Sequence, residues 1–224
     1  SACVNSDLKL TDFKLIAMDM DSTLLAIESI DEIADMQHIK PQVAAITLQT
    51  MQGEISFEES LTRRTSLLQG LHHDALQKVY DERVKLNPGA ERMLQQAKLC
   101  GLKTMVISGG FTFFTDRIKA RLGFDFAAAN VLEIDDNRLT GKVVGEIIGR
   151  QGKAQVLNQI RDELGIKREQ IIAIGDGAND LDMMELAGLS VAMCAKPIVM
   201  AHADAIITEP RLDVLIALLG WDAP

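Results

Sequence analysis

The chain has 224 residues, of which 47% are hydrophobic and 4% aromatic, and its formal net charge is −9 at pH 7. This length fits one domain that carries an insertion, and the apolar content is enough for a sizeable aliphatic core. The acidic balance leaves no basic stripe that could release counterions from a phosphate backbone, which excludes nucleic acid and an anionic membrane surface as partners. No apolar run approaches the roughly 20 residues of a membrane span.

The cysteines and the first residues indicate the compartment. Cys3, Cys100 and Cys194 are far apart and form no metal-binding or redox motif, which is typical of a reducing environment. Residues 1–7 contain neither a basic nor an apolar segment, so no signal peptide is expected. We therefore expect a cytoplasmic protein. We also expect it to be a monomer or a homodimer.

Short apolar runs recur along the chain and predict buried strands. The predicted strands cover residues 15–18, 103–107, 171–174, 189–193 and 205–208. Helical patterns lie between most of them, so the sequence predicts an α/β fold with a parallel sheet and helices on both of its faces. Ligands of such sheets bind at the carboxyl ends of the strands.

Residues 28–86 interrupt this alternation. They contain four helical patterns, over residues 28–36, 41–51, 57–68 and 73–85. Pro41 suits a first helical turn, and Asn87-Pro88-Gly89 marks the return to the alternating pattern. We expect this helical insertion to overhang the active edge of the sheet as a lid.

A second excursion covers residues 130–144. Apolar and polar residues alternate there around Asp135-Asp136-Asn137. Such a pattern is typical of two short antiparallel strands joined by a tight turn. The sequence therefore predicts a β-hairpin.

Four polar segments are spread over this framework. They are Asp19-Met20-Asp21-Ser22-Thr23, Ser108-Gly109-Gly110, Lys153 and Gly175-Asp176-Gly177-Ala178-Asn179-Asp180. Asp19, Ser108 and Asp176 each follow the end of a predicted strand, so we expect them to converge on one edge of the sheet. Burying several carboxylates together is costly unless a cation or a proton lies between them.

The carboxylates have the types and the spacing that phosphoryl transfer needs. Asp19 can attack phosphorus as a nucleophile, which divides hydrolysis into two steps. Asp21 can protonate the departing oxygen and then deprotonate water. A hard divalent cation satisfies clustered carboxylate oxygens, so we expect Mg²⁺ bound by Asp19, Asp21 and Asp176.

The remaining polar residues are candidates for holding the phosphate. Ser108 and the N–H groups of Gly109 and Gly110 can form an anion cradle ahead of a helix that begins near Phe111. Lys153 can neutralise phosphate and nucleophile together. Lys153 is therefore both a catalytic and a substrate-binding candidate, as is Ser108.

With these four segments, and from about residue 13 to 221, the chain resembles the haloacid dehalogenase superfamily, in particular its phosphatases that act on O-phosphoserine. The resemblance implies a Rossmann-like core (residues 1–27 and 87–224), an inserted C1-type helical cap (residues 28–86) and a small β-hairpin flap. It also implies a Mg²⁺-dependent phosphomonoesterase that works through a phosphoaspartyl intermediate, in the last step of serine biosynthesis.

The resemblance extends to the residues that would read the substrate, a phosphorylated amino acid. Glu28 matches the position that binds the ammonium group, and Arg64, next to Arg63, matches the one that binds the carboxylate. An arginine offers a carboxylate a bidentate fork that lysine lacks. The other matching positions are Met51 and Phe57, an apolar cover over the substrate, and Asn179, a contact on the phosphate side.

Two alternatives stay open at this point. The same chemistry could serve another small phosphometabolite, such as phosphohomoserine, or pass the phosphoryl group to an alcohol instead of water. A phospho-acceptor signalling module also combines an acidic cluster, Mg²⁺ and a doubly wound fold. Such modules, however, are shorter and have no helical insertion after the first strand.

Overall fold

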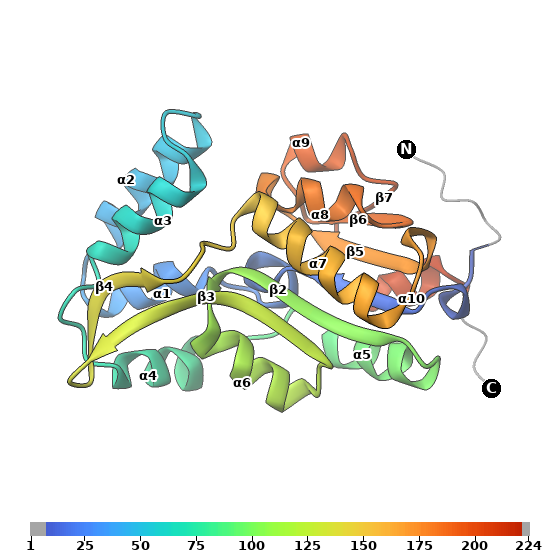
Figure 1. Cartoon of the computed structure of the whole chain (residues 1–224), viewed down its shortest axis with the longest axis horizontal. Coiled ribbons are helices and arrows are strands. Elements are labelled where there is room, and N and C mark those ends of the chain that lie inside the picture. Colours follow the sequence, from blue (N-terminus) through green and yellow to red (C-terminus); the bar gives the residue numbers. More distant parts are fainter. Residues whose placement is uncertain (1–7, 221–224) are drawn as a thin grey trace.

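A computed structural model describes residues 8–220 and contains one seven-stranded sheet in the order β4-β3-β2-β1-β5-β6-β7 (Figure 1). The strands are β1 (Leu15–Met18), β2 (Lys103–Phe111), β3 (Phe126–Asp135), β4 (Arg138–Val144), β5 (Ile171–Gly175), β6 (Leu189–Met193) and β7 (Ala205–Ile207). All neighbouring strands are parallel except β3 and β4, which are antiparallel. The predicted α/β fold with a parallel sheet is confirmed.

The five predicted strands all form, and two details of the prediction are wrong. Residues 126–129 were not predicted as a strand, yet they begin β3 and pair with β2, because sheet pairing overrides the weak strand preference of Phe-Ala-Ala-Ala. Ser108 does not follow the end of its strand. Strand β2 continues to Phe111, with an irregular register between Ile107 and Phe111.

Helices cover both faces of the sheet, as predicted (Figure 1). The helices on one face are α5 (Ala90–Leu99), α6 (Thr112–Leu122) and α10 (Val214–Leu218), and those on the other are α7 (Arg150–Leu164), α8 (Leu181–Glu185) and α9 (Pro197–Met200). Strand β1 alternates between the two cores, since Ile16 and Met18 face the first and Leu15 and Ala17 face the second. The strand is buried on both faces, which explains its continuous apolar run.

The insertion after β1 consists of four helices, as predicted. They are α1 (Ser29–Met36), α2 (Lys40–Met51), α3 (Phe57–Ser66) and α4 (Asp74–Arg83), and α2 and α3 stand out from the sheet in Figure 1. The chain leaves and returns side by side, because Leu25 and Leu86 form an antiparallel bridge. We therefore propose to divide the chain there, with residues 1–27 and 87–224 as the core and residues 28–86 as the cap.

The predicted hairpin is formed by the second half of β3 and by β4. Asp136 and Asn137 connect the strands with φ values of 45° and 59°, the left-handed conformation that a two-residue hairpin turn requires. The hairpin also pairs with the cap, because Gly70 N–H donates to Leu139 O (2.8 Å) and Leu139 N–H donates to Leu71 O (2.9 Å). The flap therefore ties the cap to the core sheet.

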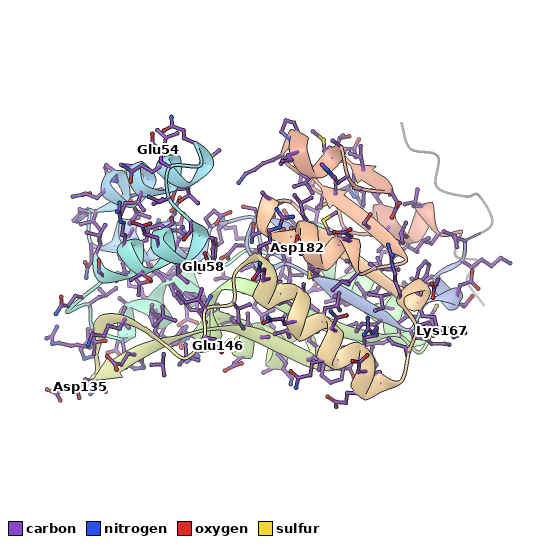
Figure 2. All side chains as sticks on the ribbon, turned by 45° about the horizontal axis from the view of Figure 1, so that its top comes forward. Glu54, Glu58, Asp135, Glu146, Lys167 and Asp182 are labelled. Atoms are coloured by element: carbon purple, nitrogen blue, oxygen red, sulfur yellow. The ribbon has the colours of Figure 1, made fainter. Side chains whose placement is uncertain are left out.

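Charged side chains of both signs are spread over the surface (Figure 2), from Glu54 at the end of the cap to Lys167 at the opposite end of the molecule. Within residues 8–220, no helix combines the length and the hydropathy needed to cross a bilayer. Cys100 and Cys194 are free thiols. Cys3 and the residues from 221 onward lie outside the described part of the chain.

Candidate active site

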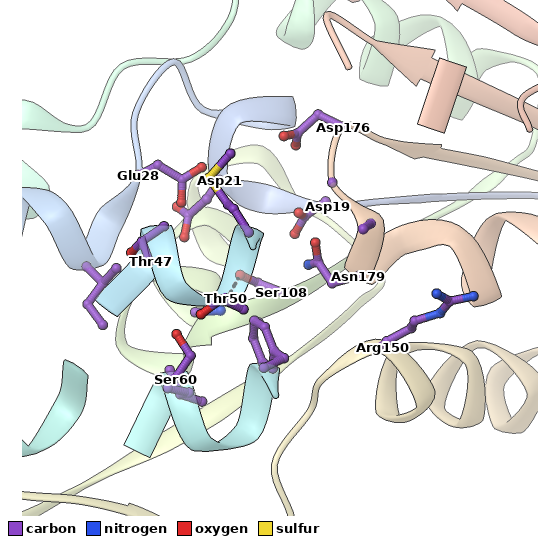
Figure 3. Close-up of a pocket in the computed structure, with 18 of the residues that line it drawn as sticks. Asp19, Asp21, Glu28, Thr47, Thr50, Ser60, Ser108, Arg150, Asp176 and Asn179 are labelled. Carbon is purple, nitrogen blue, oxygen red and sulfur yellow. Dashed lines mark hydrogen bonds between the residues drawn. The ribbon is translucent and has the colours of Figure 1, made fainter. Parts of the chain in front are cut away.

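A cavity of about 550 Å³ lies at the carboxyl ends of β1, β2 and β5, beneath helices α2 and α3 of the cap (Figure 3). Strand β1 lies between β2 and β5 in the sheet. The chain segments that follow β2 and β5 therefore lie on opposite sides of β1, which leaves a crevice at its carboxyl end. The wall contains most of the predicted site residues: Asp19, Asp21, Glu28, Met51, Phe57, Arg64, Ser108, Gly109, Asp176 and Asn179. The predicted convergence of distant segments is therefore observed.

Lys153 lies behind this wall, on the first turn of α7, and its side chain is fully buried. Its Nζ is 2.8 Å from Asp19 Oδ1 and 2.6 Å from Asp180 Oδ1. Burial alone would lower the pKa of Lys153, but the charges of Asp180 and Asp19 outweigh it and raise the pKa. Lys153 is therefore a fixed cation that positions Asp19.

Asp19 directly follows β1, and its N–H donates to Ile174 O of β5 (3.0 Å). Its Oδ1 accepts a hydrogen bond from Met20 N–H (2.7 Å) in addition to the contact with Lys153. Burial and the charge of Asp180 raise the pKa of Asp19 well above its usual value, against the opposing effect of Lys153. The ionised carboxylate thus needs further positive charge at this site.

Oxygens of Asp19, Asp176 and Asp180 lie within 4.8 Å of one another and form an acidic cluster that could hold a metal ion. Asp180 is fully buried; its Oδ1 contacts Lys153, and its Oδ2 accepts from the N–H groups of Asp176 (3.1 Å) and Gly177 (3.0 Å). Since both oxygens of Asp180 are already engaged, Asp19 and Asp176 are the better direct ligands. The clustered hard oxygen donors fit a cation such as Mg²⁺.

Asp176 is held by a hydrogen bond from a different part of the chain. Its Oδ1 accepts a hydrogen bond from Thr23 Oγ1 (2.8 Å), from the helical turn after Asp19. Burial and the charge of Asp180 raise the pKa of Asp176 to about 6. Thr23 and Asp180 belong to the segments that drew attention in the sequence, but neither was predicted as a site residue.

Asp21 lies apart from the acidic cluster. Its Oδ2 accepts from Ser29 Oγ (2.7 Å) and its Oδ1 from Ser29 N–H (3.2 Å). Burial and the charge of Glu28 raise the pKa of Asp21 to about 7, against these hydrogen bonds. Such a carboxyl can both donate and accept a proton near neutral pH. Nothing in the sequence marks Ser29, because its contact depends on the turn at Ser22, where φ is 58°.

The Ser108-Gly109-Gly110 segment approaches other parts of the site closely. A Cβ on Gly110 would lie 2.9 Å from Asp21 Oδ2, and one on Gly109 would lie 2.7 Å from the Phe57 ring. Gly110 N–H donates to Ser108 Oγ (2.8 Å). The anion cradle stays a prediction, and a phosphate would have to displace this internal partner of the Gly110 N–H.

The structure distinguishes between the two neighbouring arginines. Arg64 lines the cavity and is half-buried, whereas Arg63 is exposed and pairs with Glu59 (2.5 Å). Among the described residues no carboxylate lies within ion-pair distance of Arg64, whose Nε donates only to Ser60 O (3.4 Å). Burial lowers the pKa of Arg64 despite the nearby charges of Glu28 and others. Arg64 can therefore receive an anionic ligand.

The other cap residues lie around the same cavity. Glu28 lies beside Asp21 (Figure 3), and its Oε1 accepts a hydrogen bond from Ser22 Oγ (2.6 Å). Phe57 is packed close to Gly109 and Gly149. Met51 is 63% exposed, so in this conformation it lies at the rim and does not cover the cavity.

The comparisons with known proteins agree with this geometry. Residues 13–188 match the family of haloacid dehalogenase-like hydrolases. A phosphoserine phosphatase of Polaromonas sp. (strain JS666) is 52% identical over 95% of this chain and 92% of its own length. One of Albidiferax ferrireducens is 49% identical, over 94% and 91%. A solved phosphoserine phosphatase, described as a phospho-aspartyl intermediate analogue, matches with a TM-score of 0.87 and 40% identity, over 93% and 99%. The chain therefore belongs to the haloacid dehalogenase-like hydrolases, within the phosphoserine phosphatase family.

Proposed function

We propose that this protein hydrolyses O-phosphoserine to serine and phosphate, with Mg²⁺ as cofactor and phospho-Asp19 as intermediate. The observation that carries the proposal is Arg64, a half-buried cation in the cavity wall that has no carboxylate partner among the described residues. Asp19 in the cavity wall and Lys153 behind it would serve the phosphate. The names of the relatives support the substrate.

In the first step, Asp19 attacks phosphorus and the bond from phosphorus to the serine oxygen breaks. Lys153 Nζ and Met20 N–H both hold Asp19 Oδ1, which leaves Oδ2 as the attacking oxygen. Asp21 gives its proton to the departing serine oxygen. In the second step, Asp21 takes a proton from the water that attacks phosphorus and releases Asp19.

Mg²⁺, when bound, supplies positive charge to the carboxylates and to the phosphate oxygens. We propose Asp19 and Asp176 as its direct ligands, with Asp180 and Thr23 orienting them. Asp21 stays a predicted ligand, although its side chain is bound by Ser29 in this structure. Ser108 and Asn179, which line the cavity, are proposed to contact the phosphate.

The rest of the cavity suits the zwitterionic part of the substrate. We propose that Glu28 binds the ammonium group and Arg64 the carboxylate, so that each charge of phosphoserine meets its opposite. Phe57 would cover the substrate on the cap side, and Met51, which lies at the rim in this structure, would have to move inward to do the same. From this substrate we also propose a role in serine biosynthesis. From the scattered cysteines we propose a cytoplasmic location.

The first test is phosphate release from a panel of phosphomonoesters, with Mg²⁺ and with a chelator. The panel holds phosphoserine, phosphothreonine, phosphohomoserine, a sugar phosphate and an aryl phosphate. We expect a strong preference for phosphoserine and no activity with chelator or in Asp19→Asn. Preference for another member would keep the chemistry and reject the substrate, and a new phosphoester in place of free phosphate would indicate a phosphotransferase.

A second test uses the neighbouring arginines as a matched pair. Arg64→Ala should raise KM for phosphoserine by about 100-fold, since a charged hydrogen-bonded contact contributes about 3 kcal/mol. The same change should leave KM for the aryl phosphate nearly unchanged. Arg63→Ala removes the same charge from the exposed side of α3 and should alter neither value. Equal losses on both substrates in Arg64→Ala would contradict the carboxylate-binding role.

A further inference from the structure

A second group of metal-ligating side chains lies outside the cavity, where α3 leads into α4. His72, His73 and Asp74 are consecutive, and none of them lines the active-site cavity. The main chain here is held against the hairpin, because His73 N–H donates to Asn137 O (2.8 Å) and His72 forms a β-bridge with Arg138. The three side chains therefore start from a fixed backbone.

The donor atoms of these side chains converge. His72 Nδ1 is 3.2 Å from Asp74 Oδ2, and His73 Nδ1 is 3.1 Å from Asp74 Oδ1. One ligand atom from each residue lies within 4.8 Å of the other two. Ligands about 2.0–2.2 Å from one Zn²⁺ ion are separated from each other by about 3 Å or slightly more. The two nitrogen–oxygen distances have this length already.

The two Nδ1 atoms differ in their hydrogen bonding. Asp74 N–H donates to His72 Nδ1 (3.3 Å), which is then an acceptor. His73 Nδ1 is shielded from solvent and has no partner with hydrogen-bond geometry among the described residues, although Asp74 Oδ1 is near. The His73 ring itself is held edge-on by Phe113, with 6.4 Å between ring centroids. A metal ion here would give His73 Nδ1 a partner and would replace the weak contact of His72 Nδ1 with Asp74 N–H.

We propose that His72, His73 and Asp74 bind one transition-metal dication of the Zn²⁺ class. Two imidazole nitrogens with one carboxylate suit Zn²⁺, Co²⁺ or Ni²⁺, whereas Mg²⁺ prefers oxygen ligands alone. Water completes the coordination, because His72 and Asp74 are exposed. The site is independent of the proposed phosphatase reaction and would fix the loop between α3 and α4 on the hairpin.

The binding test is calorimetric titration of the full chain with Zn²⁺ in excess Mg²⁺, which keeps the catalytic carboxylates occupied. The double variant His72→Gln/His73→Gln should lose about 10-fold or more in affinity, since removing groups that only support a metal ligand already costs about 10- to 100-fold. The matched control is His38→Gln/His202→Gln, which removes two exposed histidines elsewhere. Asp74→Asn, which keeps the shape of the side chain, should weaken binding as well.

A second measurement needs no variant. Histidine ring signals in nuclear magnetic resonance spectra should shift with Zn²⁺ for His72 and His73 and stay in place for His38 and His202. Equal Zn²⁺ affinity in both double variants would overturn the proposal. Shifts confined to His38 or His202, or the absence of any shift, would do the same.

Discussion

Asp19 and Asp21 are two residues apart and have different surroundings. Asp19 contacts the Lys153 ammonium group, whereas Asp21 is bound by Ser29 and faces the charge of Glu28. The first environment holds the proposed nucleophile beside a fixed cation, and the second holds a carboxyl with a pKa of about 7. Two residues of one type thus acquire the two roles that the reaction needs.

Ser29 should act as a positioning residue for Asp21. Its hydroxyl and its N–H both favour the ionised form of Asp21, and Ser29→Ala removes the hydroxyl contact, so this change should raise the pKa of Asp21 further. Because Asp21 must be protonated in the first step that we propose, the basic limb of the kcat/KM profile for phosphoserine should move to higher pH. Ser22→Ala, which removes a contact to Glu28 instead, is the control. An unshifted profile in Ser29→Ala would contradict this role.

Asp180 should matter more for stability than other paired carboxylates. It is fully buried between Lys153 and the N–H groups of Asp176 and Gly177, so Asp180→Asn leaves Lys153 with one carboxylate partner. Removing one partner of a buried ion pair costs about 3–5 kcal/mol. Asp182→Asn breaks an ion pair with Arg150 near the surface and should cost about 1 kcal/mol or less. Urea unfolding of both variants measures the difference.

Helix α3 of the cap and strand β2 of the core meet closely at the catalytic edge. Phe57, the first residue of α3, lies so close to Gly109 of β2 that no side chain fits between them. Arg64 belongs to the same helix, two turns further along. This contact therefore helps to set the distance between Arg64, the proposed carboxylate ligand, and the end of the cavity that we propose for the phosphate.

Gly109→Ala should displace α3. The new Cβ would lie 2.7 Å from the Phe57 ring, and overpacking of this kind costs about 1–3 kcal/mol. We expect kcat/KM for phosphoserine to fall by about 10-fold or more, which corresponds to about 1.4 kcal/mol. The double variant Gly109→Ala/Phe57→Ala should recover part of this loss relative to Phe57→Ala alone. Strictly additive losses would show that the two elements are not coupled through this contact.

For the whole molecule, the buried carboxylates link stability to pH and to metal. Burial raises the pKa of Asp176 to about 6 and that of Asp21 to about 7, both from 3.8. Without metal, the native protein then binds more protons than the unfolded chain between about pH 4 and pH 7. The free energy of unfolding should therefore fall as pH rises through this window, and Mg²⁺ should restore it at neutral pH.

Asp176→Asn tests this linkage. The variant lacks one of the raised carboxyl groups, so with chelator its stability should fall less between about pH 4.5 and 7.5 than that of the wild type. Mg²⁺ should stabilise the wild type at the higher pH and have a smaller effect on the variant. Urea denaturation at both pH values, with Mg²⁺ and with chelator, measures each effect. A wild-type curve that is flat with chelator would contradict the linkage.

The sequence by itself determined most of the strands, the helical insertion and the polar segments of the candidate site. The four-residue run Leu15–Met18 is apolar throughout because both faces of β1 are covered, and such a run is visible without coordinates. The hairpin turn at Asp136 and Asn137 depends on a local backbone preference. The same local patterns predicted that Asp19, Ser108 and Asp176 lie at one edge of the sheet, because the carboxyl ends of parallel strands share an edge.

Contacts between distant segments were decided only by the tertiary structure. Asp180 enters the acidic cluster because α7 places Lys153 beside it, and Arg64 differs from Arg63 only in the face of α3 that meets the cavity. The strand over residues 126–129 forms because β2 offers its edge. Periodicity and motifs in the sequence indicate which residues belong to one helix or strand. The burial of a side chain, its pKa and its ion-pair partners depend on which distant residues the fold packs against it.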